Sequence, residues 1–309
     1  MNSSILQAFM SKAFCSLNIN RFISIAISGL ILSVPHFSQA ESYFNCHTSP
    51  KFLSNLNISN PAISSQEERR PGLWIVSLSN PSIINQPSSW ETLGSVGSFV
   101  ITEDGDIFTA KVPQINTLHT NFLDLNSIFK IDSLSGEAKE FYKFDSLEYP
   151  SLKNPYGIIN LSYDCSSNNL AVSVLSGSSY EEEKGRIFIL NPKTKAIVAQ
   201  IKDFDAYGIS YFYYGKGARK FLLLGSARNS ALFSVRLDSD NQVIGRPKRE
   251  LIIDKFNILK AKKIVQISDN QIKVTTTEFN YSLIGQSEFD SDVRTYEFDG
   301  VGFKQVNLK

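Results

Sequence analysis

The sequence predicts an all-β protein, because short runs of alternating apolar and polar residues fill most of it. Beyond residue 70 these runs end at Gly, Asn, Asp, Ser or Pro, which are the usual residues of turns. Aromatic residues make up 12% of the 309 residues, with 22 Phe and 12 Tyr, and both types favour strands. No stretch keeps a helical spacing of apolar residues over three turns, so we expect little helix.

The expected strands follow one another closely, and tight turns join several of them. Between two of them, Glu103-Asp104-Gly105 forms such a turn, because Asp-Gly readily supplies the positive φ of a hairpin. The expected strands are Leu73–Leu78, Ser98–Thr102, Asp106–Val112, Ile128–Ile131, Lys139–Phe144, Gly157–Tyr163, Leu170–Leu175, Arg186–Leu190, Ala196–Ile201, Gly208–Tyr213, Lys220–Leu224, Ala231–Arg236, Glu250–Ile253, Lys263–Ile267, Gln271–Thr276, Val293–Phe298 and Phe303–Asn307.

The strands form repeated units. One strand signature recurs five times, with starts 55, 59, 45 and 62 residues apart. A hairpin precedes most copies and a turn with a further strand follows, so each unit has four strands. Units of this size and composition are typical of β-propeller blades. Chain length predicts about five blades, or six if the loops are short. The five copies are Leu73–Val76, Ile128–Ile131, Ile187–Leu190, Leu232–Val235 and Arg294–Phe298.

One unit resembles a known group of propellers. The stretches Asn154–Ile158, Asp164–Val172 and Gly185–Thr194 together resemble a blade of the β-propeller superfamily, in particular of YncE-like and gluconolactonase-like bacterial propellers. The resemblance covers most of residues 73–309 and places the chain near the WD40/YVTN-like repeats, although the Trp-Asp and kelch Gly-Gly pairs are missing. It implies the architecture, whereas propellers as a class host many different activities.

Residues 1–40 differ from the rest and are predicted to be a signal peptide. They contain no Asp or Glu, and Arg21 precedes a 13-residue apolar run that ends before Pro35. Small residues at Ser38 and Ala40 suit cleavage by a signal peptidase, so we expect a secreted or periplasmic protein without a membrane span in its mature chain. The alternatives are a retained N-terminal anchor and a buried hydrophobic helix.

The mature chain divides into residues 41–72, an N-terminal extension or part of the first blade, and residues 73–309, the propeller. It retains two cysteines, Cys46 and Cys165. An even number of cysteines in an exported chain permits one disulfide, which would fix the N-terminal segment to the propeller. The alternative is that both thiols are free.

Composition excludes several classes of function. Lys and Arg together number 31 and Asp and Glu 30, so bulk charge does not support a nucleic-acid partner. No phosphate-binding glycine loop follows a strand and opens a helix. The three histidines, His36, His47 and His119, do not form a metal-ligand pattern.

The expected binding residues lie in the loops that precede the innermost strands, because those loops line the channel mouth of a propeller. They are Asn154, Tyr156, Asp205 and Tyr207. The competing interpretation, which we favour for the two tyrosines, is that they fill the space between neighbouring blades.

The sequence therefore favours an exported binding scaffold for a protein or small-molecule ligand, with no catalytic set, no cofactor and no metal. The alternative is a lactonase-type or glycosidase-type hydrolase that uses carboxylates at the channel mouth, with or without Ca²⁺. Three or more carboxylates that point into the channel mouth, close enough to bind one metal ion or to act as acid and base, would favour that alternative. Each candidate also has a structural explanation, because Asp is common in turns. The candidates are Glu103, Asp104, Asp164, Asp203, Asp205, Asp254 and Asp269.

Overall fold

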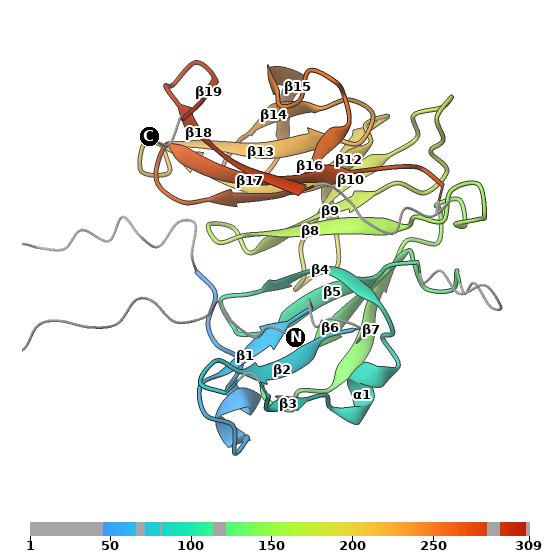
Figure 1. Cartoon of the computed structure of the whole chain (residues 1–309), viewed down its shortest axis with the longest axis vertical. Helices are drawn as coiled ribbons and strands as arrows, with labels where there is room; N and C mark the ends of the chain where they lie inside the picture. The colour runs from blue at the N-terminus through green and yellow to red at the C-terminus, as the bar shows by residue number, and fades with distance from the viewer. Residues whose placement is uncertain (1–45, 66–71, 81, 114–121, 283–290, 307–309) are drawn as a thin grey trace, which may run out of the picture. The chain divides into compact units, whose positions relative to one another are not determined.

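The computed structural model describes residues 46–65, 72–80, 82–113, 122–282 and 291–306 (Figure 1). The described residues form a five-bladed β-propeller, which confirms the predicted fold: four sheets have four antiparallel strands and the first has three. A 3-10 helix, η2 (Lys51–Asn55), and a single-turn helix, α1 (Ser88–Glu91), complete the regular structure. No helix among these residues is long and apolar enough to cross a membrane. The predicted leader and His119 lie outside the described residues.

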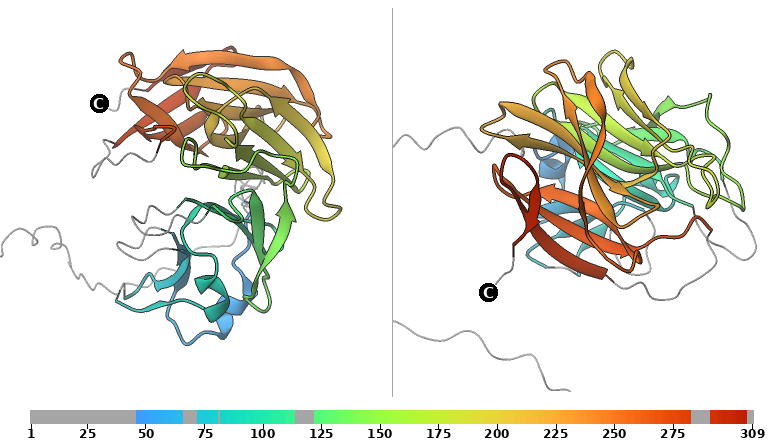
Figure 2. Two further views of the ribbon diagram at one scale, coloured as in Figure 1. Left: turned by 90° about the vertical axis from the view of Figure 1, so that its right-hand side faces the viewer. Right: turned by 90° about the horizontal axis from the view of Figure 1, so that it is seen from above.

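The sheets follow one another in chain order, as the colours of Figure 2 show. The first blade contains β1 (Pro61–Ser64), β2 (Trp74–Ser77) and β3 (Ile84–Asn85), and the second contains β4 (Val96–Ile101), β5 (Ile107–Lys111), β6 (Ser127–Ile131) and β7 (Ala138–Lys143). The third contains β8 (Ile158–Asp164), β9 (Asn169–Val174), β10 (Arg186–Leu190) and β11 (Ile197–Lys202). The fourth contains β12 (Ala206–Tyr214), β13 (Arg219–Ser226), β14 (Ala231–Leu237) and β15 (Val243–Ile252), and the fifth contains β16 (Leu259–Gln266), β17 (Gln271–Glu278), β18 (Ser291–Phe298) and β19 (Phe303–Gln305).

The five copies of the repeated signature fall on equivalent strands. They coincide with β6, β10, β14 and β18, each the third strand of its sheet, and with β2 in the first blade. Because β2 corresponds to a third strand, β1 and β3 correspond to a second and a fourth. Among the described residues the first blade therefore has no counterpart of an innermost strand.

The main differences from the expected strands are at β1, β3 and β15, and the two-residue strand β3 was not predicted. β1 lies in a segment where the sequence showed no strand pair, yet Pro61–Ser64 pairs in full register with Trp74–Ser77. The strand expected at Glu250–Ile253 begins earlier, at Val243, and includes Gly245 and Pro247. These two residues obscured the strand pattern. They are tolerated because β15 is the outermost strand of its sheet, where a missing N–H disrupts no ladder.

Polar side chains join the innermost strands of neighbouring blades. Ser98 Oγ donates to the carbonyl of Leu161 at 3.3 Å, which links β4 to β8. Gln266 accepts from the backbone N–H of Tyr213 at 2.9 Å and donates to its carbonyl at 2.7 Å, which links β16 to β12. Backbone groups at the inner strand edges are thereby satisfied across the blade interface, as buried polar groups require.

Aromatic side chains fill the space between blades, as the high aromatic content suggested. Phe144 at the end of the second blade stacks on Phe188 of the third at 4.5 Å. Phe212 of the fourth blade packs against Phe298 and Phe303 of the fifth at 5.7 and 5.3 Å. These buried rings supply much of the apolar area that holds the blades together.

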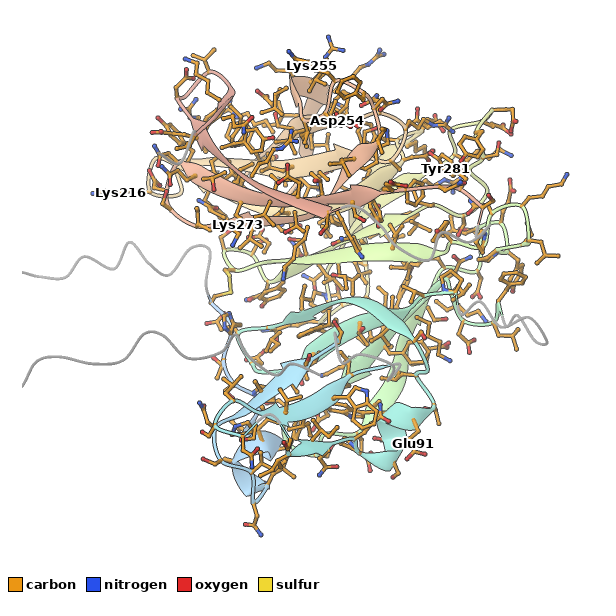
Figure 3. The ribbon with its side chains drawn as sticks, in the orientation of Figure 1. Glu91, Lys216, Asp254, Lys255, Lys273 and Tyr281 are labelled. Carbon is orange, nitrogen blue, oxygen red and sulfur yellow. A yellow bond between two sulfur atoms is a disulfide. The ribbon has the colours of Figure 1, made fainter. Side chains whose placement is uncertain are left out.

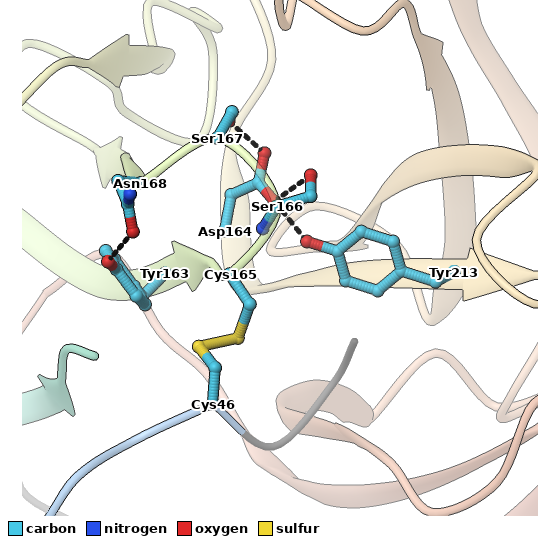
Figure 4. Close-up of a disulfide and its surroundings, with 8 residues drawn as sticks. All are labelled: Cys46, Tyr163, Asp164, Cys165, Ser166, Ser167, Asn168 and Tyr213. Atoms are coloured by element: carbon cyan, nitrogen blue, oxygen red, sulfur yellow. Dashed lines mark hydrogen bonds between the residues drawn. A yellow bond between two sulfur atoms is a disulfide. The ribbon is translucent and has the colours of Figure 1, made fainter. Parts of the chain in front are cut away.

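Cys46 and Cys165 form the predicted disulfide (Figure 4), with their Cα atoms 5.6 Å apart. Cys165 lies in the turn between β8 and β9, so the bond attaches the segment that leads to the first blade to the third blade. Beside it, the fully buried carboxylate of Asp164 forms an ion pair with Lys220 at 2.9 Å and accepts hydrogen bonds from Tyr213 and, at 2.8 Å, from Asn241. Asp164 thus ties the third blade to the fourth.

The pKa of Asp164 reflects these contacts. Burial alone would raise the pKa of this carboxyl, but hydrogen bonds from Ser167 and Tyr213 and the charge of Lys220 outweigh burial and lower it to about 2. The negative charge of Asp164 is therefore part of the folded state at neutral pH.

Replacing both Cys46 and Cys165 with serine should lower the free energy of unfolding by about 5 kcal/mol, because the bond restricts the unfolded chain over a separation of 119 residues. Urea unfolding followed by tryptophan fluorescence measures the change. Wild-type protein treated with a reductant is the control and should match the double variant. Equal stability of the oxidised wild type and the variant would contradict the prediction.

Asp164→Asn should lower the free energy of unfolding at pH 7 by about 3 kcal/mol, because it leaves the buried Lys220 without its counter-charge. Since the folded pKa lies below the unfolded value of about 3.9, this contribution is present above pH 4 and is lost as the pH falls towards 2. Urea titrations at several pH values should therefore show the two proteins converging in acid. The exposed Asp240→Asn is the matched control, and a difference that does not depend on pH would refute the explanation.

Candidate functional site

The candidate site lies on one face of the propeller, which we call the loop face. In each antiparallel blade, the connection into the first strand and the connection between the second and third strands emerge on the same side. In Figure 3, Tyr281 from the connection after β17 lies on one side, and Lys216 from the turn between β12 and β13 lies on the other. The described connections on the loop face include residues 144–157, 175–185, 203–205, 227–230, 253–258 and 279–282.

Five aromatic rings from three blades form a continuous row on the loop face. Phe279 lies between Tyr156 and Tyr207, with ring centroids at 5.3 and 4.8 Å. Tyr281 contacts Phe279 at 5.1 Å and Tyr180 at 5.3 Å. We call these five residues the aromatic row. The row brings together two of the residues predicted from the sequence, Tyr156 and Tyr207, through a side chain that the sequence did not single out.

Tyr156 and Tyr207 are half-buried and remain neutral over the physiological pH range. Burial raises the pKa of Tyr156 to about 12 and raises the pKa of Tyr207 further above its usual value. Neither hydroxyl makes a hydrogen bond to another described residue. The two side chains therefore combine apolar ring surface with a polar group, a combination common at binding interfaces.

Asp205 lies beside the aromatic row and is fully buried. Its carboxylate accepts hydrogen bonds from the backbone N–H of Gly185 at 2.8 Å, from Ser178 at 2.5 Å and from the hydroxyl of Tyr281. A side chain at Gly185 would place its Cβ 2.3 Å from the Asp205 carboxylate, so only glycine permits this approach. Asp205 thus joins connections of the third, fourth and fifth blades.

Arg228 supplies the counter-charge. Its Nε lies 2.9 Å from Asp205 and 3.6 Å from Glu183, and its guanidinium lies over the ring of Tyr281 at 5.3 Å. The same group donates to the carbonyls of Ser179 at 2.7 Å and Tyr180 at 3.1 Å. Burial raises the pKa of Glu183, and the negative charge of Asp205 raises it further.

Asn154 is also engaged within the protein. Its amide donates to the carbonyl of Leu175 at 2.6 Å, and its oxygen accepts from the N–H of Tyr156 at 3.0 Å. Because Asn154 is buried, these bonds fix the loop that carries Tyr156. Asn154 and Asp205 therefore hold loops in place, whereas Tyr156 and Tyr207 offer partly accessible surface.

The carboxylates that the hydrolase alternative would need are spread over both faces. Asp164 lies at the β8–β9 turn and Asp205 on the loop face, while Asp254 accepts backbone N–H groups of its own loop at 2.8 to 3.0 Å. No group of three or more His, Cys, Asp or Glu within the described ranges could hold a metal ion. His47 is exposed near the disulfide, in a hollow of about 250 Å³ on the face opposite the loop face.

The sequence did not single out Phe279, Tyr281 and Arg228. Phe279 and Tyr281 are the first and third residues after β17, at the start of a long connection, and Leu175 and Gly177 have these positions after β9. Two aromatic residues directly after a predicted strand could have indicated a site there. Strand periodicity, however, does not show which loops of different blades contact one another. Arg228 carried no local signal, because its partners come from other connections.

No family model and no curated protein matches the sequence. Among solved structures, Kuenenia stuttgartiensis hydrazine synthase matches at 14% identity and a TM-score of 0.44, over 91% of this chain and 70% of that chain. A Dyadobacter fermentans protein of unknown function matches at 12% identity and 0.46, over 82% and 70%. TolB from Acinetobacter baumannii matches at 13% and 0.41, and the match covers 76% of this chain but only 48% of TolB. Because these TM-scores and sequence identities are low, the fold assignment rests on the sheet topology of the chain itself. The YncE-like resemblance stays a prediction.

Arg228→Met should leave the buried Asp205 without its counter-charge and release the 178–185 loop. We expect the free energy of unfolding to fall by about 3 kcal/mol, because a buried carboxylate is then unpaired. Hydrogen exchange should rise more at Gly185, whose N–H binds Asp205, than in the central strand β13, because local loop release adds to the loss of global stability. The exposed Arg246→Met is the control, and unchanged exchange at Gly185 would contradict the role given to Arg228.

Proposed function

We propose that the protein is an exported scaffold that binds a protein or small-molecule ligand through its loop face. Tyr156 and Tyr207 contact the ligand, while Asn154 and Asp205 hold the loops that present it. The proposal assigns no cofactor, metal or catalytic residue. The Cys46–Cys165 disulfide is compatible with an oxidising compartment, as the predicted signal peptide requires.

One observation carries the proposal. The described residues include three strongly exposed aromatic side chains, Tyr149 at 67%, Tyr180 at 61% and Phe256 at 85%, and all three belong to connections of the loop face. Exposed aromatic residues are favoured at binding surfaces, because they bury a large area with few rotatable bonds when a partner covers them. Tyr180 also continues the aromatic row outwards to solvent.

The hydrolase alternative receives less support. Asp205 is the carboxylate nearest to the aromatic row, and its two oxygens are occupied by Gly185, Ser178, Tyr281 and Arg228. Because both oxygens of Asp205 are already engaged within the protein, this carboxylate is poorly placed to contact a substrate.

A photo-crosslinking amino acid placed at position 180, and separately at Lys216 on the opposite face, tests the proposal in cells that export the chain. We expect a specific adduct from position 180 and none from position 216. Tyr207→Ala should reduce the adduct without changing the amount of folded protein. Equal labelling at both positions, or an adduct that Tyr207→Ala does not affect, would count against the loop face as the binding surface.

A further inference from the structure

Two connections of the third blade form a single surface on the loop face. Lys184 of the β9–β10 connection forms an ion pair with Glu148 of the β7–β8 connection at 3.0 Å. Behind this pair, Asn154 donates to the carbonyl of Leu175 at 2.6 Å. Because both bonds join residues of different connections, the side chains of residues 144–157 and 175–185 are presented together.

This surface exposes apolar side chains that no described residue covers. Tyr149 is 67% exposed, Leu152 79% and Tyr180 61%. Tyr180 is nevertheless held in place, because its hydroxyl donates to Asn280 at 2.5 Å and its ring contacts Tyr281. A fixed, exposed aromatic ring loses little conformational entropy on binding, which suits it as an anchor for a partner.

The charge on the same surface is negative. Residues 144–157 and 175–185 contain five carboxylates, at Asp145, Glu148 and Glu181–Glu183, but only two lysines. Lys184 is already shared between Glu148 and Glu182, at 3.0 Å each. The excess of negative charge favours a positively charged partner and repels a phosphate backbone or an anionic membrane surface.

Arg228 illustrates how this region holds a cation. Its guanidinium is bound by the carboxylate of Asp205, by two loop carbonyls and by the face of Tyr281. The neighbouring exposed surface offers the same kinds of groups, namely carboxylates, carbonyls and the ring of Tyr180, to a cation from outside.

We propose that Glu148, Tyr149, Leu152, Tyr180, Glu181 and Glu182 form a docking patch for an extended protein segment that carries Lys or Arg beside an aromatic or aliphatic side chain. The apolar side chain packs against Tyr149, Leu152 and Tyr180, and the cation pairs with Glu181 and Glu182. This inference rests on the proposed function of the loop face and specifies the chemistry of its partner.

Fluorescence anisotropy with two labelled peptides tests the docking patch. The first peptide has one Trp flanked by two Arg in a Gly/Ser chain, and the second has Glu in place of both Arg. We expect the full-length protein to bind the basic peptide at least about tenfold more tightly than the acidic one, with the difference shrinking as salt is added.

Two charge-matched variants locate the binding. Glu181→Lys combined with Glu182→Lys should weaken binding of the basic peptide by about tenfold, because two attractive contacts become repulsive. Glu137→Lys combined with Glu140→Lys changes the net charge equally, at exposed positions outside the loop face, and should have little effect. Tyr180→Ser should weaken binding of the basic peptide at any salt concentration. All of these substitutions are at exposed positions, so thermal unfolding should be unchanged.

Equal effects of the two charge variants would overturn the inference, because they would indicate nonspecific attraction. Equal affinity for both peptides would also overturn it. If neither peptide binds while the adduct from position 180 persists in cells, the basic partner is excluded and the loop face remains the proposed binding surface. Loss of that adduct would instead count against the proposed function itself.

Discussion

The close approach of the innermost strands is the constraint on which the rest of the structure depends. Gly208 in β12 and Gly225 in β13 face Ala261 of β16, and a Cβ at either position would lie 2.6 or 2.5 Å from the Ala261 carbonyl oxygen. Without side chains there, the fourth and fifth blades can approach until Gln266 reaches the backbone of β12. The wedge-shaped space further out is then filled by phenylalanines.

Two buried carboxylates secure the third and fourth blades on opposite faces. Asp164 binds Lys220 and Asn241 on the face opposite the loop face, and Asp205 binds Gly185 and Arg228 on the loop face. Each accepts several donors from other strands or loops, so each charge is compensated where burial would otherwise be costly. Rigid support of this kind holds the tyrosines of the loop face in a fixed arrangement, which would lower the entropy lost on the proposed binding.

The proposed binding residues illustrate how much of the site the local sequence pattern could predict. Tyr156 and Tyr207 were predicted because each was expected just before the innermost strand of its blade, and these equivalent positions place them on the same face. Phe279, which joins them, lies at the end of a second strand of another blade. Its proximity depends on how three blades pack, and no local pattern contains that information.

By itself, the sequence determined the strand pattern, the four-strand period and the presence of a cysteine pair, because alternation and turn chemistry act over a few residues. The near-equal totals of acidic and basic residues were also evident, but they concealed the local excess of carboxylates on residues 144–157 and 175–185. Only the tertiary structure decided the pairing of Cys46 with Cys165, the burial of Asp205 and the contact of its carboxylate with Arg228. These features join residues that are distant in the chain, and blade packing alone brings such residues together.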